Sequence, residues 1–251
     1  MVLTWQTFAI VCPLVFLAGF IDSIAGGGGL ISLPAYYLAG LSPTLAAGTN
    51  KLSAGLGTIV STLRYVRGKK VLWNVGILAA LGAFPGSWLG AQVLQSIPED
   101  AVRVLMIAAI PLVAVVVLRQ RGDLSRRRTP VQWDGPMSFA IGLAVGFYDG
   151  LVGPGTGTFL ILAFTMLMGM EGVMASGTAK VVNLTSNVAA LLALLGGGNV
   201  LFLLGLPAAL CGMAGNWLGA GLTIRRGTGL IRVILLVVLA LLLAKMVYDV
   251  L

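Results

Sequence analysis

Apolar runs follow one another from one end of this sequence to the other, and most of them are long enough to cross a lipid bilayer. One crossing as a helix needs about 20 consecutive apolar residues. Of the 251 residues, 58% are hydrophobic and only 10% are charged, whereas a soluble domain carries about 25% charged residues. The runs lack the alternation of apolar and polar residues that marks a membrane β-barrel. The sequence therefore predicts an all-α polytopic membrane protein.

Glycine, proline and charged residues divide the apolar sequence into two halves of the same plan. Each half is expected to contain three long transmembrane helices and a helical hairpin broken by glycines. The expected hairpins combine residues 5–25 with 30–40 and 137–152 with 157–170, and the expected long helices cover 44–66, 71–94, 101–118, 172–195, 200–224 and 229–248. The predicted division of the chain is a first membrane repeat (1–118), a basic cytoplasmic linker (119–136) and a second membrane repeat (137–251).

Short motifs recur at a constant distance along the chain. The motif GTNK, which ends at Lys51, matches GTAK, which ends at Lys180 (180 − 51 = 129). The motif GSWLGA at residues 86–91 matches GNWLGA at residues 215–220 with the same offset. A constant offset between separate motifs indicates an internal repeat that spans most of the chain.

The charges of the loops indicate that the two halves have opposite orientations. In the first half, the GTNK helix leads to the basic loop RGKK, and the next helix leads to the acidic loop SIPED. In the second half, the equivalent loops are the neutral GGGN and the basic RRGTG. Because basic loops stay in the cytoplasm, the sequence predicts inverted repeats, a plan common in secondary transporters whose site lies near the bilayer midplane. The charges do not decide whether the hairpins span the bilayer or are re-entrant.

Two lysines lie inside apolar helices at equivalent positions of the two halves. A charged side chain within the membrane costs at least about 2.5 kcal/mol and is by default a candidate functional group. We therefore expect Lys51 and Lys180 to bind a negatively charged substrate. The alternatives are snorkelling to the nearer membrane surface and ion pairs with aspartate that only hold helices together.

Neutral polar side chains accompany each lysine on its helix. Thr58 shares a helix face with the first lysine, and Asn183 and Asn187 share a face with the second. Such a stripe on an apolar helix should line the bundle interior or an aqueous path, although interhelical hydrogen bonds would also explain it. Further hydrogen bonds to the substrate are expected from the motif residues Thr49, Asn50 and Thr178.

A glycine-rich break follows an aspartate in each hairpin. The stretch GFIDSIAGGGGLISLP contains Asp22, and GFYDGLVGPGTGTFLIL contains Asp149. Glycine costs about 1 kcal/mol relative to alanine inside a helix, so each break should end one helix and start a short second one. Free N–H groups at a helix N-terminus form an anion site, and we predict that the two breaks face each other across a central site. The expected donors at the breaks are Gly27, Gly28, Gly155 and Thr156.

The two aspartates permit several interpretations. Asp22 and Asp149 could take up protons coupled to transport, or they could be counter-ions of the lysines, and N-capping of the short helix is a further option. An intramembrane aspartyl protease is the least favoured alternative. That family needs a GxGD-type partner motif, and the GFID of this chain is not one.

Composition removes several other kinds of site. The chain has no histidine, which excludes histidine metal sites, Ser-His triads and histidine proton relays, and neither a metal nor a cofactor is predicted. Cys12 and Cys211 lie in apolar segments and are expected to be buried thiols. The net charge of +8 fits cytoplasmic basic loops. Because the basic runs are short and lack interleaved aromatic residues, no nucleic-acid partner is expected.

These motifs together resemble the TauE/SafE family of membrane exporters. The resemblance rests on the pattern GFIDSIAGGGGLISLPAYYLAGLSPTLAAGTNK, on its second copy GFYDGLVGPGTGT…ASGTAK and on the glycine-tryptophan repeats, and it covers nearly the whole chain. It implies export of sulfite or related sulfur-containing organic anions from bacterial cells. The second copy has GPGTG for GGGG and Ala179 for Asn50, so the two half-sites differ.

The sequence thus predicts a non-enzymatic secondary transporter that exports a small oxyanion, such as sulfite or an organosulfonate. An inside-negative potential already drives anions outward by about 2.3 kcal/mol per charge per 100 mV, so a uniport would suffice. An anion channel of the same architecture is the alternative. The expected location is the bacterial cytoplasmic (inner) membrane, with several crossings. The expected partners are the small anionic substrate and the lipid bilayer, and a homo-oligomer is compatible with the sequence.

Overall fold

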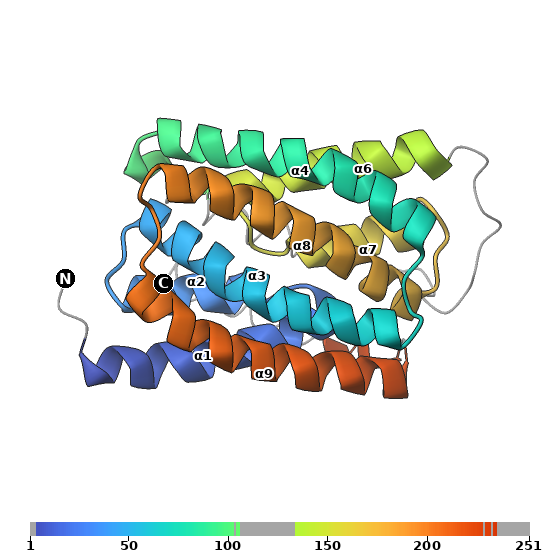
Figure 1. Cartoon of the computed structure of the whole chain (residues 1–251), viewed down its shortest axis with the longest axis horizontal. Coiled ribbons are helices and arrows are strands. Elements are labelled where there is room, and N and C mark those ends of the chain that lie inside the picture. The colour runs from blue at the N-terminus through green and yellow to red at the C-terminus, as the bar shows by residue number, and fades with distance from the viewer. Residues whose placement is uncertain (1–3, 103, 106–133, 228, 232, 235–251) are drawn as a thin grey trace, which may run out of the picture.

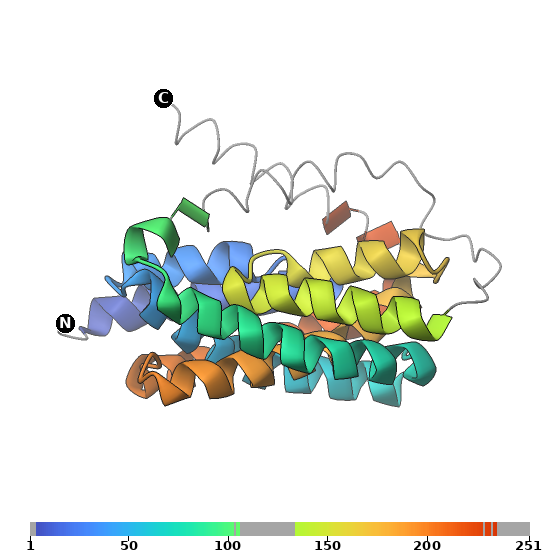
Figure 2. The ribbon, with the colours of Figure 1, turned by 90° about the horizontal axis from the view of Figure 1, so that it is seen from above.

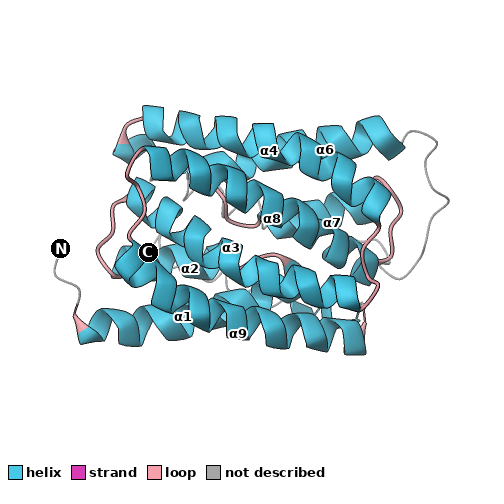
Figure 3. Cartoon of the chain, in the orientation of Figure 1, coloured by secondary structure: helices cyan, strands magenta, loops and turns pink. Residues whose placement is uncertain are grey.

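The computed structural model describes residues 4–102, 104–105, 134–227, 229–231 and 233–234. Every secondary-structure element in this part of the chain is a helix (Figure 3), as the sequence predicts. The helices are α1 (Trp5–Ala25), α2 (Gly29–Leu38), α3 (Pro43–Arg67), α4 (Trp73–Ser96), α6 (Asp134–Leu151), α7 (Thr156–Met166), α8 (Gly172–Gly196) and α9 (Phe202–Arg226). The predicted helices 101–118 and 229–248 and the predicted linker 119–136 fall largely outside the described residues.

Four of the described helices, α1, α4, α8 and α9, are long and apolar enough to cross a membrane. The chain is therefore a multi-pass membrane protein. Helix α3 has 25 residues and thus sufficient length, but many of its side chains are polar and most of these are buried in the bundle. Helices α2 and α7 have 10 and 11 residues. That is roughly 15 Å of helix, about half the thickness of a hydrocarbon core.

The helices pack in layers (Figure 1). Helices α1 and α9 form one outer layer, α4 and α6 form the opposite one, and α3 and α8 lie between them. Figure 2 shows α4 and α6 running side by side. Within each outer layer the two helices approach closely, because small residues face the neighbouring backbone. A Cβ atom on Gly86 would lie 2.4 Å from the Leu143 carbonyl oxygen. A Cβ atom on Gly215 would lie 2.0 Å from the Phe16 carbonyl oxygen.

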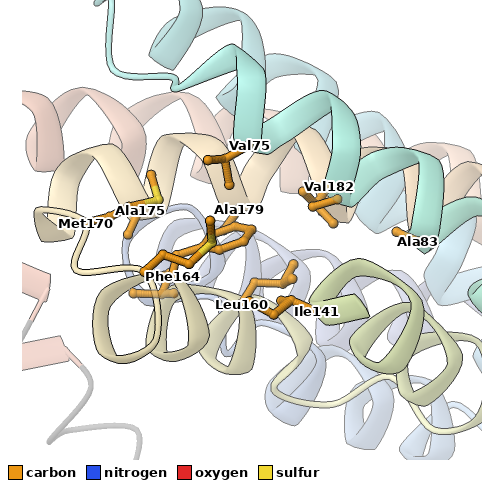
Figure 4. Close-up of a cluster of buried hydrophobic side chains, with 12 residues drawn as sticks. Val75, Ala83, Ile141, Leu160, Phe164, Met170, Ala175, Ala179 and Val182 are labelled. Atoms are coloured by element: carbon orange, nitrogen blue, oxygen red, sulfur yellow. The ribbon is translucent and has the colours of Figure 1, made fainter. Parts of the chain in front are cut away.

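Four clusters of buried hydrophobic residues lie within the described part of the bundle, and two of them show how helices from both sequence halves combine. One core joins α4 to α6, α7 and α8, and it contains Val75 from α4 together with Leu160 and Phe164 from α7 (Figure 4). The other joins α9 to α1, α2 and α3, with Leu204 from α9 and Leu33 from α2. Each half therefore contributes one helix to the core of the other, and the two halves do not pack as separate bodies.

Contacts between the halves come in matched pairs. The Leu72 N–H donates a hydrogen bond to the Thr178 hydroxyl at 3.0 Å, and the Leu201 N–H donates one to the Thr49 hydroxyl at 3.0 Å. Each residue of the second pair is equivalent to one of the first, since both differences are 129 (178 − 49 and 201 − 72). A contact made by the first half on the second is thus repeated by the second half on the first.

Each hairpin returns to the end of the bundle at which it began. Helix α1 ends at Gly26, whose backbone is left-handed (φ 81°) and whose N–H bonds the Asp22 carbonyl oxygen at 2.8 Å. Helix α2 then folds back along the first half of α1, and Tyr36 and Val11 belong to the same hydrophobic core. Helix α7 folds back along α6 in the same way and lies at the opposite end of the bundle from α2 (Figures 1 and 2).

Candidate functional site

The two glycine breaks touch each other at the centre of the bundle. The Thr158 N–H donates to the Gly26 carbonyl oxygen at 3.3 Å, and the Thr158 hydroxyl donates to the Ala25 carbonyl oxygen at 2.8 Å. A Cβ atom on Gly26 would lie 2.1 Å from the carbonyl carbon of Gly157. Because only glycines permit this approach, the backbones of the two breaks form one junction. The structure thereby brings the breaks into direct contact, and the open space lies beside the junction.

Two buried ion pairs flank this junction, and each joins one sequence half to the other. The Lys51 Nζ atom on α3 lies 2.7 Å from Oδ1 of Asp149 on α6. The Lys180 Nζ atom on α8 lies 2.5 Å from Oδ2 of Asp22 on α1. The lysines therefore do not snorkel to a membrane surface. Of the interpretations that the sequence leaves open for the aspartates, the geometry is that of counter-ions to the lysines.

The two aspartates differ in how firmly the protein holds them. Asp149 is 3% exposed, and besides the lysine its carboxylate accepts hydrogen bonds from the Thr156 hydroxyl at 2.7 Å and from the Ser186 hydroxyl. Asp22 is 17% exposed, and besides its lysine it accepts one long hydrogen bond of 3.4 Å from the Gly28 N–H. The Asp22 carboxylate is thus the more accessible and the less tightly bonded of the two.

A cavity opens beside the junction, between the two aspartates. The empty space there, which includes open solvent at the mouth, is about 510 Å³. Among its lining residues are eight that the sequence predicted for the site: Asp22, Gly28, Asn50, Lys51, Asp149, Thr156, Asn183 and Asn187. The structure therefore gathers residues from both halves around one space.

The other predicted site residues do not line this cavity. Lys180 is 1% exposed and reaches the cavity only through its partner aspartate. Thr58 donates to the Ala54 carbonyl oxygen of its own helix at 2.7 Å. The remaining predicted residues away from the cavity are Thr49, Thr178, Gly27 and Gly155. Several amides at the breaks already have protein acceptors, such as Gly28 N–H with Asp22 and Thr158 N–H with Gly26.

The hydroxyls of Thr49 and Thr178 hold the starts of neighbouring helices, and this arrangement can be tested. We expect Thr178→Val to lower the free energy of unfolding by about 1 kcal/mol, because the Leu72 N–H loses its acceptor. Anion affinity should stay at the wild-type value. Chemical unfolding in detergent together with a binding titration would measure both quantities. A loss of affinity without loss of stability would instead place this hydroxyl in the binding site.

Sequence reasoning missed several polar residues of the cavity wall, above all Asn216 on α9. Its side chain is 3% exposed and lines the cavity with Ser32 and Ser53. The sequence contained a signal for Asn216. This asparagine is the second residue of GNWLGA, and the equivalent position of GSWLGA is Ser87. A large polar residue in a row of small packing residues needs a neighbour that makes room for it. That neighbour is Gly57, where a Cβ atom would lie 2.6 Å from the Asn216 side-chain nitrogen.

The charges of the site differ from those of a pair of catalytic carboxylates. Two ammonium groups and two carboxylates give a formal net charge of zero, which a buried site tolerates better than a net charge. In an aspartyl protease two carboxylates share one proton, whereas here each carboxylate contacts a lysine. Since an ammonium group has three N–H donors, Lys51 on the cavity wall can keep its aspartate and still donate to a ligand.

Comparison with known proteins finds similarity to one family of membrane transporters over nearly the whole chain. The family model described as "Sulfite exporter TauE/SafE" matches residues 11–246. The "Probable membrane transporter protein YfcA" of Escherichia coli K12 is 36% identical over 256 residues, covering 98% of this chain and 94% of that protein. A "Probable membrane transporter protein" of Haemophilus influenzae is 36% identical over 241 residues, covering 93% of this chain and 92% of that protein. No solved structure matches the chain.

Proposed function

Because the chain belongs to the TauE/SafE family of membrane transporters, we propose that it is a secondary transporter which exports a small oxyanion, such as sulfite or an organosulfonate, across the bacterial cytoplasmic membrane. The observation that carries this proposal is the cavity at the junction of the two glycine breaks, with Lys51 on its wall and both aspartates at its edge. The description of this family as sulfite exporters supports sulfite as a substrate. The proposed partners are this solute and the lipid bilayer, and self-association is compatible with the proposal.

Alternating access in this proposal follows from two inverted repeats, residues 1–118 and 137–251, joined by the linker 119–136. The matched contacts of Thr49 and Thr178 support this arrangement, and so does the exchange of α4 and α9 between the two cores. The half-length helices α2 and α7 lie at opposite ends of the bundle and act as re-entrant hairpins. Rocking one repeat against the other would then open the cavity first to one side and then to the other.

The anion enters a site whose cations already have partners. It can share the ammonium group of Lys51, and it can compete with Asp22 for Lys180, since this aspartate is the more exposed one. An Asp22 carboxylate displaced in this way would be free to take up a proton, which couples the anion to proton movement. The membrane potential adds an outward driving force of about 2.3 kcal/mol per charge per 100 mV.

Removing either lysine should abolish most of the transport. In proteoliposomes we expect Lys51→Ala and Lys180→Ala to lower the initial rate of labelled sulfite flux about 100-fold, the equivalent of about 2.7 kcal/mol. The reason is that the anion loses the cation which offsets its desolvation. The exposed Arg67 on α3 provides the matched control, and Arg67→Ala should transport at the wild-type rate.

A loss of folding would imitate this result, so the double variant Lys51→Ala/Asp149→Ala is also needed. It leaves no unpaired buried charge and should elute as a single species from a sizing column, yet it should remain inactive. Wild-type flux in both single lysine variants would contradict the proposal that the two ammonium groups bind the anion. Absence of sulfite and sulfonate flux in the wild-type protein would sink the proposed substrate class.

A further inference from the structure

Among the described residues, two buried side-chain oxygens have no hydrogen-bond partner, and both belong to residues of the cavity wall. They are Oδ1 of Asn50 on α3 and Oδ1 of Asn216 on α9. The two side chains are 6% and 3% exposed. A buried acceptor without a donor is unfavourable and calls for a specific explanation. Here both asparagines line the cavity in which a ligand of the proposed transporter would bind.

The orientation of the Asn216 amide is fixed by its own helix. Its nitrogen donates to the Gly212 carbonyl oxygen at 3.0 Å, and a carbonyl oxygen accepts only from a donor. The NH₂ group must therefore face that carbonyl, and the oxygen of the amide remains the free group. Two glycines leave the space for this amide. A Cβ atom on Gly19 would lie 2.7 Å from the amide nitrogen, and one on Gly57 would lie 2.6 Å from it.

Neither asparagine has an equivalent in the other repeat. Ala179 stands at the position equivalent to Asn50, and Ser87 stands at the position equivalent to Asn216. The Ser87 hydroxyl is satisfied, since it donates to the Ser186 carbonyl oxygen at 2.7 Å. Among the described residues, the unpaired acceptors thus belong to α3 and α9, two helices that pack against each other.

Resting on the proposed function, we infer that the transported anion also carries a hydrogen-bond donor, which it presents to the side-chain oxygens of Asn50 and Asn216. Two carbonyl oxygens repel the lone pairs of a fully deprotonated oxyanion but accept from a hydroxyl, an acid proton or an N–H group. The donor can be a proton on the oxyanion itself or a hydroxyl substituent of an organic sulfonate. The ammonium group of Lys51 then binds the charged end.

Two pairs of anions distinguish a proton on the oxyanion from a hydroxyl substituent as the donor. The members of each pair match in charge and shape and differ in the donor. Hydrogenphosphate and sulfate differ by one proton on the oxyanion, and hydroxyethanesulfonate and ethanesulfonate differ by one hydroxyl. Titration calorimetry of the purified full chain, at a mildly alkaline pH where phosphate is mainly hydrogenphosphate, gives the ratio of dissociation constants within each pair. We expect the donor-bearing member to bind about tenfold more tightly in at least one pair.

The variants take their residues from the other repeat, so they fit positions of the same fold. Asn216→Ser and Asn50→Ala should each bring the ratio close to one by weakening only the donor-bearing anion. The control is Asn199→Ala, which removes an asparagine paired with Gln95 outside the cavity and should leave the ratio unchanged.

The outcomes of these titrations test the inference and the proposed function separately. A wild-type ratio near one in both pairs, or a preference that survives in both asparagine variants, overturns the inference. Wild-type protein that binds none of the four anions, and no sulfite in the same titration, overturns the proposed function itself. Binding of the anions without a preference for the donor-bearing member would therefore contradict the inference but not the proposed function.

Discussion

Replacing Gly26 by alanine should leave almost no folded protein. The residue has φ 81°, a conformation that costs an alanine about 1–2 kcal/mol. In addition, the new Cβ atom would lie 2.1 Å from the carbonyl carbon of Gly157 and 2.3 Å from the Thr158 nitrogen. Both neighbours are backbone atoms of the other break, so the clash cannot be relieved by turning a side chain. We expect a loss of stability above about 4 kcal/mol.

Gly40 provides the matched control for this prediction. It has nearly the same backbone angle, φ 82°, but nothing lies within 4 Å of a Cβ atom built on it. Gly40→Ala should therefore show only the cost of the left-handed conformation and should accumulate as a single species. Elution from a sizing column and thermal unfolding in detergent would measure both variants. Equal behaviour of the two would show that the junction of the breaks is looser than the structure indicates.

Removing Asp149 should destabilise the protein by about 3–5 kcal/mol, because it leaves a buried cation without a partner. The Lys51 side chain is 6% exposed, and the hydroxyls of Thr156 and Ser186 also lose their acceptor. Chemical unfolding of Asp149→Ala in detergent would give the size of the loss. A loss below about 1 kcal/mol would mean that water reaches this lysine readily.

A double-mutant cycle identifies the partner of Asp149. Adding Lys51→Ala to Asp149→Ala should restore most of the lost stability, since the double variant contains no unpaired charge. Adding Lys180→Ala instead should restore nothing, because that lysine belongs to Asp22. If the two double variants were equally stable, the pairing seen in the structure would not be the one that stabilises the protein.

Most of the helices were predictable because their causes are local. The expected helix 44–66 is observed as Pro43–Arg67, and the expected helix 172–195 is observed as Gly172–Gly196. Runs of apolar residues define where such helices lie, and glycines end them through the cost of glycine inside a helix. The short helices after the two breaks were predictable for the same reason. The comparison of motifs at the offset of 129 also needs no tertiary information.

The partners of the charged groups could not be read from the sequence. Helical periodicity tells which residues share a face with Lys51, but it does not tell which other helix that face meets. Only the folded chain shows that Lys51 contacts Asp149 of the other half, and that Thr49 supports a helix start away from the cavity. The same holds for Asn216, whose place on the cavity wall depends on α9 joining the core of the first half.

The sequence by itself determined the membrane class, the helical segments, the two breaks and the short list of polar groups that a bilayer protein would place inside. These follow from hydropathy and backbone preference, which act over a few neighbouring residues. The tertiary structure decided that the halves exchange a helix, that the breaks touch, and that each lysine is neutralised by the aspartate of the opposite half. Those features arise from contacts between residues more than 50 positions apart, whose geometry depends on how whole helices pack.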